Sequence, residues 1–253
     1  MEEGGMRLYT AGGSKANREA CRELGVGLMM CDGWRDPSEY PFFSVDNGAF
    51  SAWSQGKRWN PSTFLHILTR CAEEGRRPEF AVLPDIVGGG EDSLRLSMAW
   101  HEALDATFPG TRWALAVQDG MNEGMVRRIC GTWGWLDKVS TIFVGGTMEW
   151  KLATMERWAR FAHERGMDCH VGRMGTVERM LMAERAGADS IDSTTWVQRN
   201  GCLRHHVTEY RARTMLEDFV RRRDEKREEV EYLWRAGIIP RNAQERPATA
   251  RQS

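Results

Sequence analysis

Long apolar stretches are missing from this sequence, and their absence excludes one class of protein. No segment approaches the roughly 18 uninterrupted apolar residues that a transmembrane helix needs. The first residues, MEEGGMRLYT, also lack the charged segment and the apolar segment that together mark a secretory signal peptide. We therefore expect a soluble protein that is not exported, works in the cytoplasm and has no membrane partner.

Paired cysteines are missing as well. The chain has six cysteines, but no two of them show the C-x-x-C spacing of a metal knuckle or a redox couple. They are Cys21, Cys31, Cys71, Cys130, Cys169 and Cys202. We interpret them as reduced thiols of a cytosolic protein, most of them filling the core.

The chain as a whole has almost no net charge, at −1, but its two parts carry opposite net charges. From Arg199 onward there are 13 Lys and Arg against 9 Asp and Glu, a net of +4, whereas the preceding part has 22 against 27, a net of −5. A basic end on an acidic body is typical of a surface that binds a polyanion. The segment RRRDEKREEVEYLWR mixes both signs, however, so a solvated helix supported by i,i+4 ion pairs fits equally well.

A regular alternation of two kinds of segment is present. Eight short apolar runs each precede a turn signal: RLYTAGG, GLMMCDG, FFSVDNG, EFAVLPDIVGGG, WALAVQDG, TIFVGGT, CHVGRMG and ADSIDSTT. Between most of them lie segments with apolar residues at helical spacing, such as STFLHILTRCAEEG and EWKLATMERWARFAHERG. Eight strand and helix units predict an α/β fold with a closed (β/α)8 barrel, and an open doubly wound sheet is the main competitor.

The alternation stops near residue 200, which sets the expected domain boundaries. We assign residues 1–205 to the barrel, residues 206–238 to a basic C-terminal helical extension and residues 239–253 to a disordered tail. The extension carries apolar residues that we expect to form buried stripes along its helices. They are Leu216, Phe219, Val220, Val230, Leu233 and Trp234.

Polar residues gather at the predicted strand ends, where parallel α/β barrels carry their active sites. They are Asp46 in VDNGAF, Asp85 in LPDIVGGG, Gln118 in AVQDG, Gly145 and Gly146 in VGGT, and Asp192 in SIDSTTW. Carboxylates, an amide and backbone donors at one barrel mouth suit a planar heterocycle with donor and acceptor edges. Taken singly, each aspartate also fits a helix cap, and VGGT or GRMG also fits a tight turn or a phosphate cradle.

Four of these segments, in order, resemble the motifs of the tRNA-guanine transglycosylases. They are SVDNGAFSAW, ALAVQDG, FVGGTMEWK and CHVGRMGTVERMLMAERAGADSIDSTTWVQRNG, and they cover roughly residues 40–201. The resemblance implies a (β/α)8 barrel that exchanges guanine in a polynucleotide for a 7-deazaguanine base, which is a co-substrate, with no cofactor. It also implies roles for individual residues.

By this resemblance Asp192 is the nucleophile that attacks the sugar C1′. Asp46 is the general acid that helps guanine depart and the general base that deprotonates the incoming 7-deazaguanine. Such a division suits glycosyl exchange, because a carboxylate can trap an oxocarbenium-like sugar covalently. The implied base-binding residues are Phe50, which stacks on the base, and Asp85, Gln118, Gly145 and Gly146, which lie along its edges. The implied phosphate contact is Arg199, and the basic extension adds Arg204, Arg221, Arg222 and Arg223 as candidates for binding nucleic acid.

The chain also departs from the tRNA enzymes. After Asp192 it is two residues shorter, and it lacks their cysteine and histidine zinc site, because Cys202 is the last cysteine and His205 with His206 makes no four-ligand set. We therefore predict no metal. Their C-terminal RNA-binding domain has no counterpart either.

What is left looks like the small phage-type DNA 7-deazaguanine transglycosylases. DNA is therefore the preferred partner over tRNA, and the host cytoplasm is the expected location if the chain is phage-encoded. The target base would have to be flipped or presented single-stranded. Whether a second copy of the chain or an accessory protein supplies further DNA contacts stays open.

Three other functions stay open at this point. The first is the same exchange on tRNA. The second is a metabolic barrel enzyme that holds the phosphate of a small molecule with VGGT and GRMG. The third is a non-catalytic barrel that binds nucleic acid, in which Asp46 and Asp192 would be structural caps.

Overall fold

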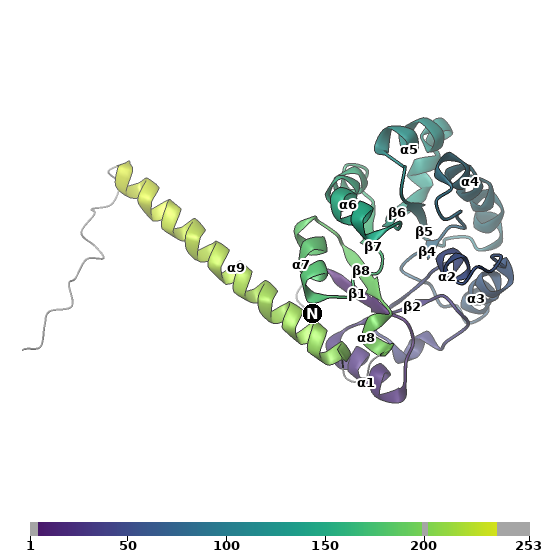
Figure 1. Cartoon of the computed structure of the whole chain (residues 1–253), viewed down its shortest axis with the longest axis horizontal. Helices are drawn as coiled ribbons and strands as arrows, with labels where there is room; N and C mark the ends of the chain where they lie inside the picture. Colours follow the sequence, from purple (N-terminus) through teal and green to yellow (C-terminus); the bar gives the residue numbers. More distant parts are fainter. Residues whose placement is uncertain (1–4, 199–201, 237–253) are drawn as a thin grey trace, which may run out of the picture. The chain divides into compact units, whose positions relative to one another are not determined.

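Eight parallel strands close into a barrel in the computed structural model, which describes residues 5–198 and 202–236 (Figure 1). The strands are β1 (Arg7–Thr10), β2 (Gly27–Met30), β3 (Phe43–Val45), β4 (Ala81–Val82), β5 (Trp113–Val117), β6 (Val139–Val144), β7 (Asp168–Val171) and β8 (Ser190–Ser193). Each strand pairs with the next, and β1 pairs with β8. The predicted (β/α)8 barrel is confirmed and the open sheet is wrong, because the first and last strands are hydrogen-bonded neighbours.

Helices surround the barrel (Figure 1). They are α1 (Lys15–Leu24), α2 (Ala49–Ser54), α3 (Pro61–Glu73), α4 (Gly90–Thr107), α5 (Glu123–Cys130), α6 (Met148–His163), α7 (Val177–Arg185) and α8 (Thr195–Gln198), with short 3-10 turns η1 (Pro37–Glu39) and η2 (Thr132–Lys138). Several begin at a side-chain cap: the Thr147 hydroxyl accepts from Trp150 N at the start of α6, and the Thr176 hydroxyl accepts from Arg179 N at the start of α7.

Apolar side chains fill the barrel interior. One buried cluster consists of Tyr9, Met29, Phe80, Val82, Ala114 and Ala116, with Phe42 and Phe143 packed against it. The alternation of large rings and small alanines lets residues from opposite strands interdigitate. All six cysteines are free thiols, and Cys21, Cys71, Cys130 and Cys169 are buried.

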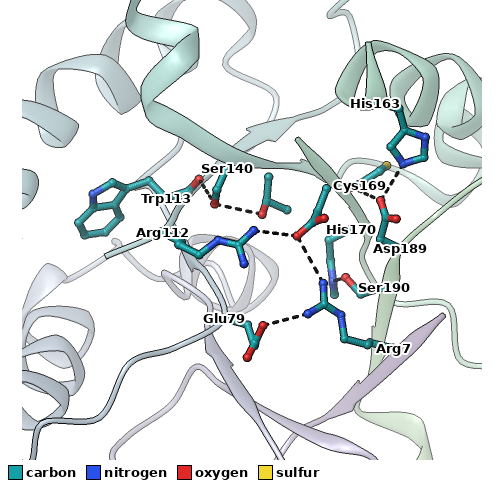
Figure 2. A network of polar contacts seen from close by, with 12 residues as sticks. Arg7, Glu79, Arg112, Trp113, Ser140, His163, Cys169, His170, Asp189 and Ser190 are labelled. Atoms are coloured by element: carbon teal, nitrogen blue, oxygen red, sulfur yellow. Dashed lines mark hydrogen bonds and ion pairs between the residues drawn. The ribbon is translucent and has the colours of Figure 1, made fainter. Parts of the chain in front are cut away.

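Ion pairs connect residues at the N-terminal ends of the strands, opposite the mouth (Figure 2). Arg7 pairs with Glu79 at 2.9 Å and with Asp168 at 3.3 Å, and Arg112 pairs with the same Asp168 oxygen at 2.9 Å. These four residues lie at or just before the starts of β1, β4, β7 and β5, and they link strands that are far apart in the sequence. Interactions at this end of a barrel serve stability rather than chemistry.

The chain divides into two compact units, Met1–Thr208 and Glu209–Ser253, and α9 (Cys202–Arg235) supplies the described part of the second. Three side chains of the expected buried stripe, Leu216, Phe219 and Val220, are 62%, 65% and 36% exposed, so that prediction is wrong for them. The physical reason is that the described residues of this unit form a single helix, which has no second element of its own unit to pack against. Residues 239–253, predicted to be disordered, lie outside the described residues. Within the described ranges, no helix combines the length and apolarity of a membrane span.

Candidate functional site

A pocket of about 220 Å³ opens at the C-terminal ends of the strands. Its walls include every residue that the sequence predicts for catalysis or base binding. They are Asp46, Phe50, Asp85, Gln118, Gly145, Gly146 and Asp192. Asp46, which follows β3, and Asp192, which belongs to β8, therefore share one cavity although they are far apart in the sequence.

Asp46 directly follows β3, and its carboxylate is held by the turn that comes after it. Oδ1 accepts a hydrogen bond of 2.7 Å from the N–H of Gly48, whose φ of 79° is a left-handed conformation that favours glycine. Burial raises the pKa of Asp46 to about 6, and the nearby carboxylates of Asp192 and Asp85 act in the same direction. A carboxyl group with this pKa can carry a proton near neutral pH.

Asp192 lies within β8 and is also buried, but its pKa moves the other way. Burial by itself would raise the pKa, yet the hydrogen bond from His170 and the one from the N–H of Arg173 outweigh it, so the pKa lies below its usual value. His170 Nε2 and Arg173 N both lie 3.1 Å from the same oxygen, Oδ1. The second oxygen, Oδ2, accepts no hydrogen bond from the described residues.

Asp85 and Gln118 belong to one hydrogen-bonded network. Asp85 accepts from the side-chain amide of Asn47 at 2.8 Å and from that of Gln118 at 3.1 Å. The Gln118 carbonyl oxygen in turn accepts from Gly88 N at 2.8 Å. Burial raises the pKa of Asp85, while the two amides counteract it. In this structure the Gln118 amide is occupied by the chain, so its predicted bond to a base carbonyl would require a rearrangement.

The glycine pair after β6 forms a further part of the pocket wall. Gly145 continues the sheet by donating to Val117 O at 2.8 Å. Gly146 has a φ of 77°, and an added Cβ would clash with the carboxylate of Asp119. Within the described part of the chain the N–H of Gly146 has no hydrogen-bond acceptor, so it is available to an oxygen of a bound molecule.

Three residues of the site were missed by sequence reasoning. Arg173 lies in GRMG, which fits a simple turn, but its guanidinium covers the ring of Phe50 and donates to the carbonyl of Gly146. Lys151 is fully buried on α6 and donates to the carbonyl of Gly172; burial lowers its pKa to about 7. His170 lies inside β7. A basic residue within an otherwise apolar strand or helix face was the available signal for His170 and Lys151.

The described candidates for binding nucleic acid are Arg204, Arg221, Arg222 and Arg223. Arg204 pairs with Glu23 of α1 and does not line the pocket. Arg221, Arg222 and Arg223 lie on α9, and Arg221 and Arg223 form ion pairs with Asp218 and Asp224 of their own helix. Arg199 lies outside the described residues.

An aromatic and basic segment that the sequence did not single out follows Phe50. Trp53 on α2 is 59% exposed, and its ring centre lies 5.6 Å from that of Phe50. Lys57 and Arg58, both exposed, come after the turn at Gln55 and Gly56. At the end of this segment the indole N–H of Trp59 donates to Asn47 O at 2.8 Å. Both Phe50, where the segment starts, and Trp59, where it ends, are therefore close in space or sequence to the turn that follows Asp46.

No known protein-family model matches the chain, and no curated protein matches it. The described residues contain no group of three or more His, Cys, Asp or Glu side chains that could hold a metal ion. The function therefore has to follow from the chemistry of the pocket and from the motifs of the sequence.

Proposed function

We propose that this chain is a transglycosylase that exchanges guanine in DNA for a 7-deazaguanine base through a covalent aspartyl-glycosyl intermediate. The observation that carries this proposal is the pair Asp46 and Asp192. Both carboxylates line one pocket, and their pKa values are displaced in opposite directions. When the pKa values of two carboxyl groups differ in this way, the group with the higher pKa can donate a proton and the other can act as an ionised nucleophile.

The first half of the reaction releases guanine. Asp192 Oδ2 attacks C1′ of the target nucleotide, a C1′–O bond forms, and the C1′–N9 bond breaks. Asp46 gives its proton to the departing guanine, which leaves neutral, and Asp46 becomes a carboxylate. The transition state resembles an oxocarbenium ion, which the ionised Asp192 stabilises.

The second half installs the new base. Asp46, now ionised, takes the proton from N9 of the 7-deazaguanine, and N9 attacks C1′ from the side that guanine left. The C1′–O bond to Asp192 breaks, so both carboxyl groups return to their starting states. Because C1′ is inverted twice, the configuration of the sugar is retained.

The pocket walls suit a purine-like base. Phe50 offers a ring face for stacking, Asp85 can accept from the N–H groups of the base edge, and the N–H of Gly146 can donate to its carbonyl oxygen. A phosphate cradle is a poorer fit to the same glycines. The N–H of Arg173 donates to Asp192, and the N–H of Thr147 donates to Asp119 at 2.7 Å, so carboxylates already occupy donors that an anion would need.

The surface beside the pocket supports a polynucleotide substrate. An exposed tryptophan, Trp53, next to two exposed cations, Lys57 and Arg58, offers stacking to a neighbouring base and charge to its phosphates. We favour DNA over tRNA because the segment that follows Asp192 lacks the cysteine and histidine zinc motif of the tRNA enzymes that the chain resembles. The reaction would then take place in the cytoplasm.

Base exchange followed by nucleoside mass spectrometry tests the proposal. The protein is incubated with 7-cyano-7-deazaguanine and either single-stranded DNA, duplex DNA or unmodified tRNA. We expect the deazaguanine deoxynucleoside in DNA and its loss in Asp192→Ala. Incorporation into tRNA alone would show that the substrate is RNA and not DNA. If the deazaguanine enters neither DNA nor tRNA, base exchange with this co-substrate is refuted.

A further inference from the structure

His170 is a buried titratable residue to which the proposed reaction gives no part. Its side chain is fully buried, and Figure 2 shows it beside Ser190. Its ring stacks on Phe143, with centroids 4.8 Å apart and an 18° angle between planes, and its other neighbours include Phe80 at 5.1 Å and Tyr9 at 5.8 Å. An imidazole enclosed by three aromatic rings has little freedom to rotate.

Both ring nitrogens of His170 have partners on β8. Nδ1 lies 2.9 Å from Ser190 Oγ and Nε2 lies 3.1 Å from Asp192 Oδ1. Ser190 and Asp192 are two residues apart, so both side chains point to the same face of the sheet, and Ser190 is the register partner of His170. The pairing of β7 with β8 thus brings the imidazole to the carboxylate.

The partners also determine the tautomer. An ionised Asp192 can only accept hydrogen bonds, so the proton of a neutral imidazole must be on Nε2. Nδ1 is then an acceptor, and the Ser190 hydroxyl donates to it. Burial lowers the pKa of His170 although Asp192 acts in the opposite direction, which favours the neutral ring. In that state both ring nitrogens have complementary partners.

We propose that His170 is a positioning residue for Asp192: its Nε2–H, together with the N–H of Arg173, occupies Oδ1, so that Oδ2 is the oxygen directed at C1′. This inference rests on the proposed function for what Oδ2 attacks. The arrangement itself is a property of the resting protein and can be measured without a substrate.

Charged groups around the pair enter the pH dependence. Lys151 on α6 and Arg7 on β1 act on His170, while Asp46, Arg173 and Lys151 act on Asp192. Losing the His170 donor removes one hydrogen bond to an ionised acceptor, which is expected to raise the pKa of Asp192 by about one to two units. Asp192 must be ionised to attack, so the acid limb of the reaction would move to higher pH by the same amount.

The first experiment is NMR on the full-length protein. Side-chain ¹⁵N spectra report the tautomer of His170, and ¹³C spectra report the titration of Asp192, assigned with Asp192→Asn. We expect a neutral Nε2–H ring in the wild type and a raised Asp192 pKa in His170→Met. His170→Gln, whose amide can donate in place of Nε2–H, should reverse most of the shift.

A matched control is available in His101, a second buried histidine, which packs against Trp113 and Trp135 outside the pocket. His101→Met should leave the Asp192 titration unchanged. If His170→Met does not fold, Ser190→Ala provides a milder test, because it removes the donor that selects the tautomer and should raise the Asp192 pKa by a smaller amount. An Nδ1–H tautomer in the wild type, or an unshifted Asp192 in the folded His170→Met or Ser190→Ala protein, would overturn the proposal.

Activity separates this inference from the proposed function. In His170→Met we expect single-turnover formation of the aspartyl-glycosyl intermediate to slow about 10- to 100-fold, with unchanged binding of free 7-cyano-7-deazaguanine. A wild-type protein that exchanges no base while its His170 and Asp192 titrate as described would refute the function and leave the positioning role standing.

Discussion

The guanidinium carbon of Arg173 lies 3.7 Å from the centre of the Phe50 ring. The same Arg173 is, among the described residues other than glycine, the one with a positive φ, at 62°. Backbone strain of this kind is kept where a side chain is needed at a functional site. Here the side chain brings a cation beside Asp46 and Asp192, and the three groups act on one another's titration.

This relationship predicts a pH effect. In the proposed reaction Asp46 has to be protonated to release guanine, so activity is expected below its pKa and is expected to be lost as the pH rises through it. Arg173 lowers the pKa of Asp46, which burial raises to about 6. Arg173→Gln should therefore move the basic limb of guanine release upward by up to about one pH unit, whereas Arg173→Lys, which keeps the charge, should move it less. Single-turnover rates measured across the neutral range would show a stationary limb if Arg173 had no such effect.

The roles proposed for Asp192 and Asp46 predict different kinds of loss. Asp192→Asn should form no covalent intermediate with DNA, because the amide is not a nucleophile. Asp46→Asn should still bind DNA but release guanine more slowly by a factor of about 10² to 10⁴, the usual contribution of a general acid. Denaturing mass spectrometry of the protein after incubation with DNA distinguishes the two. An adduct in Asp192→Asn would show that another group is the nucleophile.

Gly146 predicts a stability effect with an internal control. Gly146→Ala combines a left-handed φ of 77° with a clash against Asp119, whereas Gly166→Ala has a similar φ of 68° and open space around its Cβ. Both should lose about 1 kcal/mol to backbone strain, and Gly146→Ala should lose more. Thermal unfolding measures the difference. Equal losses would mean that the loop between β6 and α6 moves to accommodate the methyl group.

The exposed ring of Trp53 predicts a loss of DNA affinity. If it stacks on a base next to the target, Trp53→Ala should weaken binding of single-stranded DNA by about 1–3 kcal/mol. Met182→Ala, on α7 and 45% exposed, is the control for removing an exposed apolar side chain. Fluorescence anisotropy with a labelled oligonucleotide gives both values. Unchanged affinity in Trp53→Ala would show that the Trp53 ring does not contribute to DNA binding.

The arginines of α9 predict a change in salt dependence. Replacing Arg221, Arg222 and Arg223 with Gln in the full chain should weaken DNA binding and lower the slope of log K against log salt by about 1 for each phosphate that an arginine had neutralised. Arg221 and Arg223 already pair with Asp218 and Asp224, which would reduce the effect. An unchanged slope would assign the helix to a role that does not involve phosphate.

The barrel was predictable because its signal is repeated eight times. Each strand is largely buried and precedes a turn. An error in the predicted boundary of one strand therefore leaves the number of strand and helix units at eight. The pocket lining was predictable for a related reason: once parallel strands are assigned, residues such as Asp46 and Asp192 must meet at the same end.

Other parts of the site depend on contacts that a linear pattern does not carry. The contacts of His170 depend on the register of β7 against β8, which places it beside Ser190 and Asp192. Arg173 reaches Phe50 across 123 positions of sequence, from 173 to 50, and only the folded chain shows it. The exposure of Leu216 and Phe219 was missed because helical periodicity predicts an apolar face without showing whether anything covers it.

Closure of the barrel through β1 and β8 has a consequence for how the protein is made. Asp192 is contributed by the last strand, and that strand completes the ring only by pairing with the first. A ribosome-bound chain therefore has Asp46 long before it has the partner carboxylate, and the pocket exists only once synthesis has passed residue 193 and the ring has shut. The complete pocket would thus appear in one late step, and if the proposed base exchange is observed, its appearance would report complete folding.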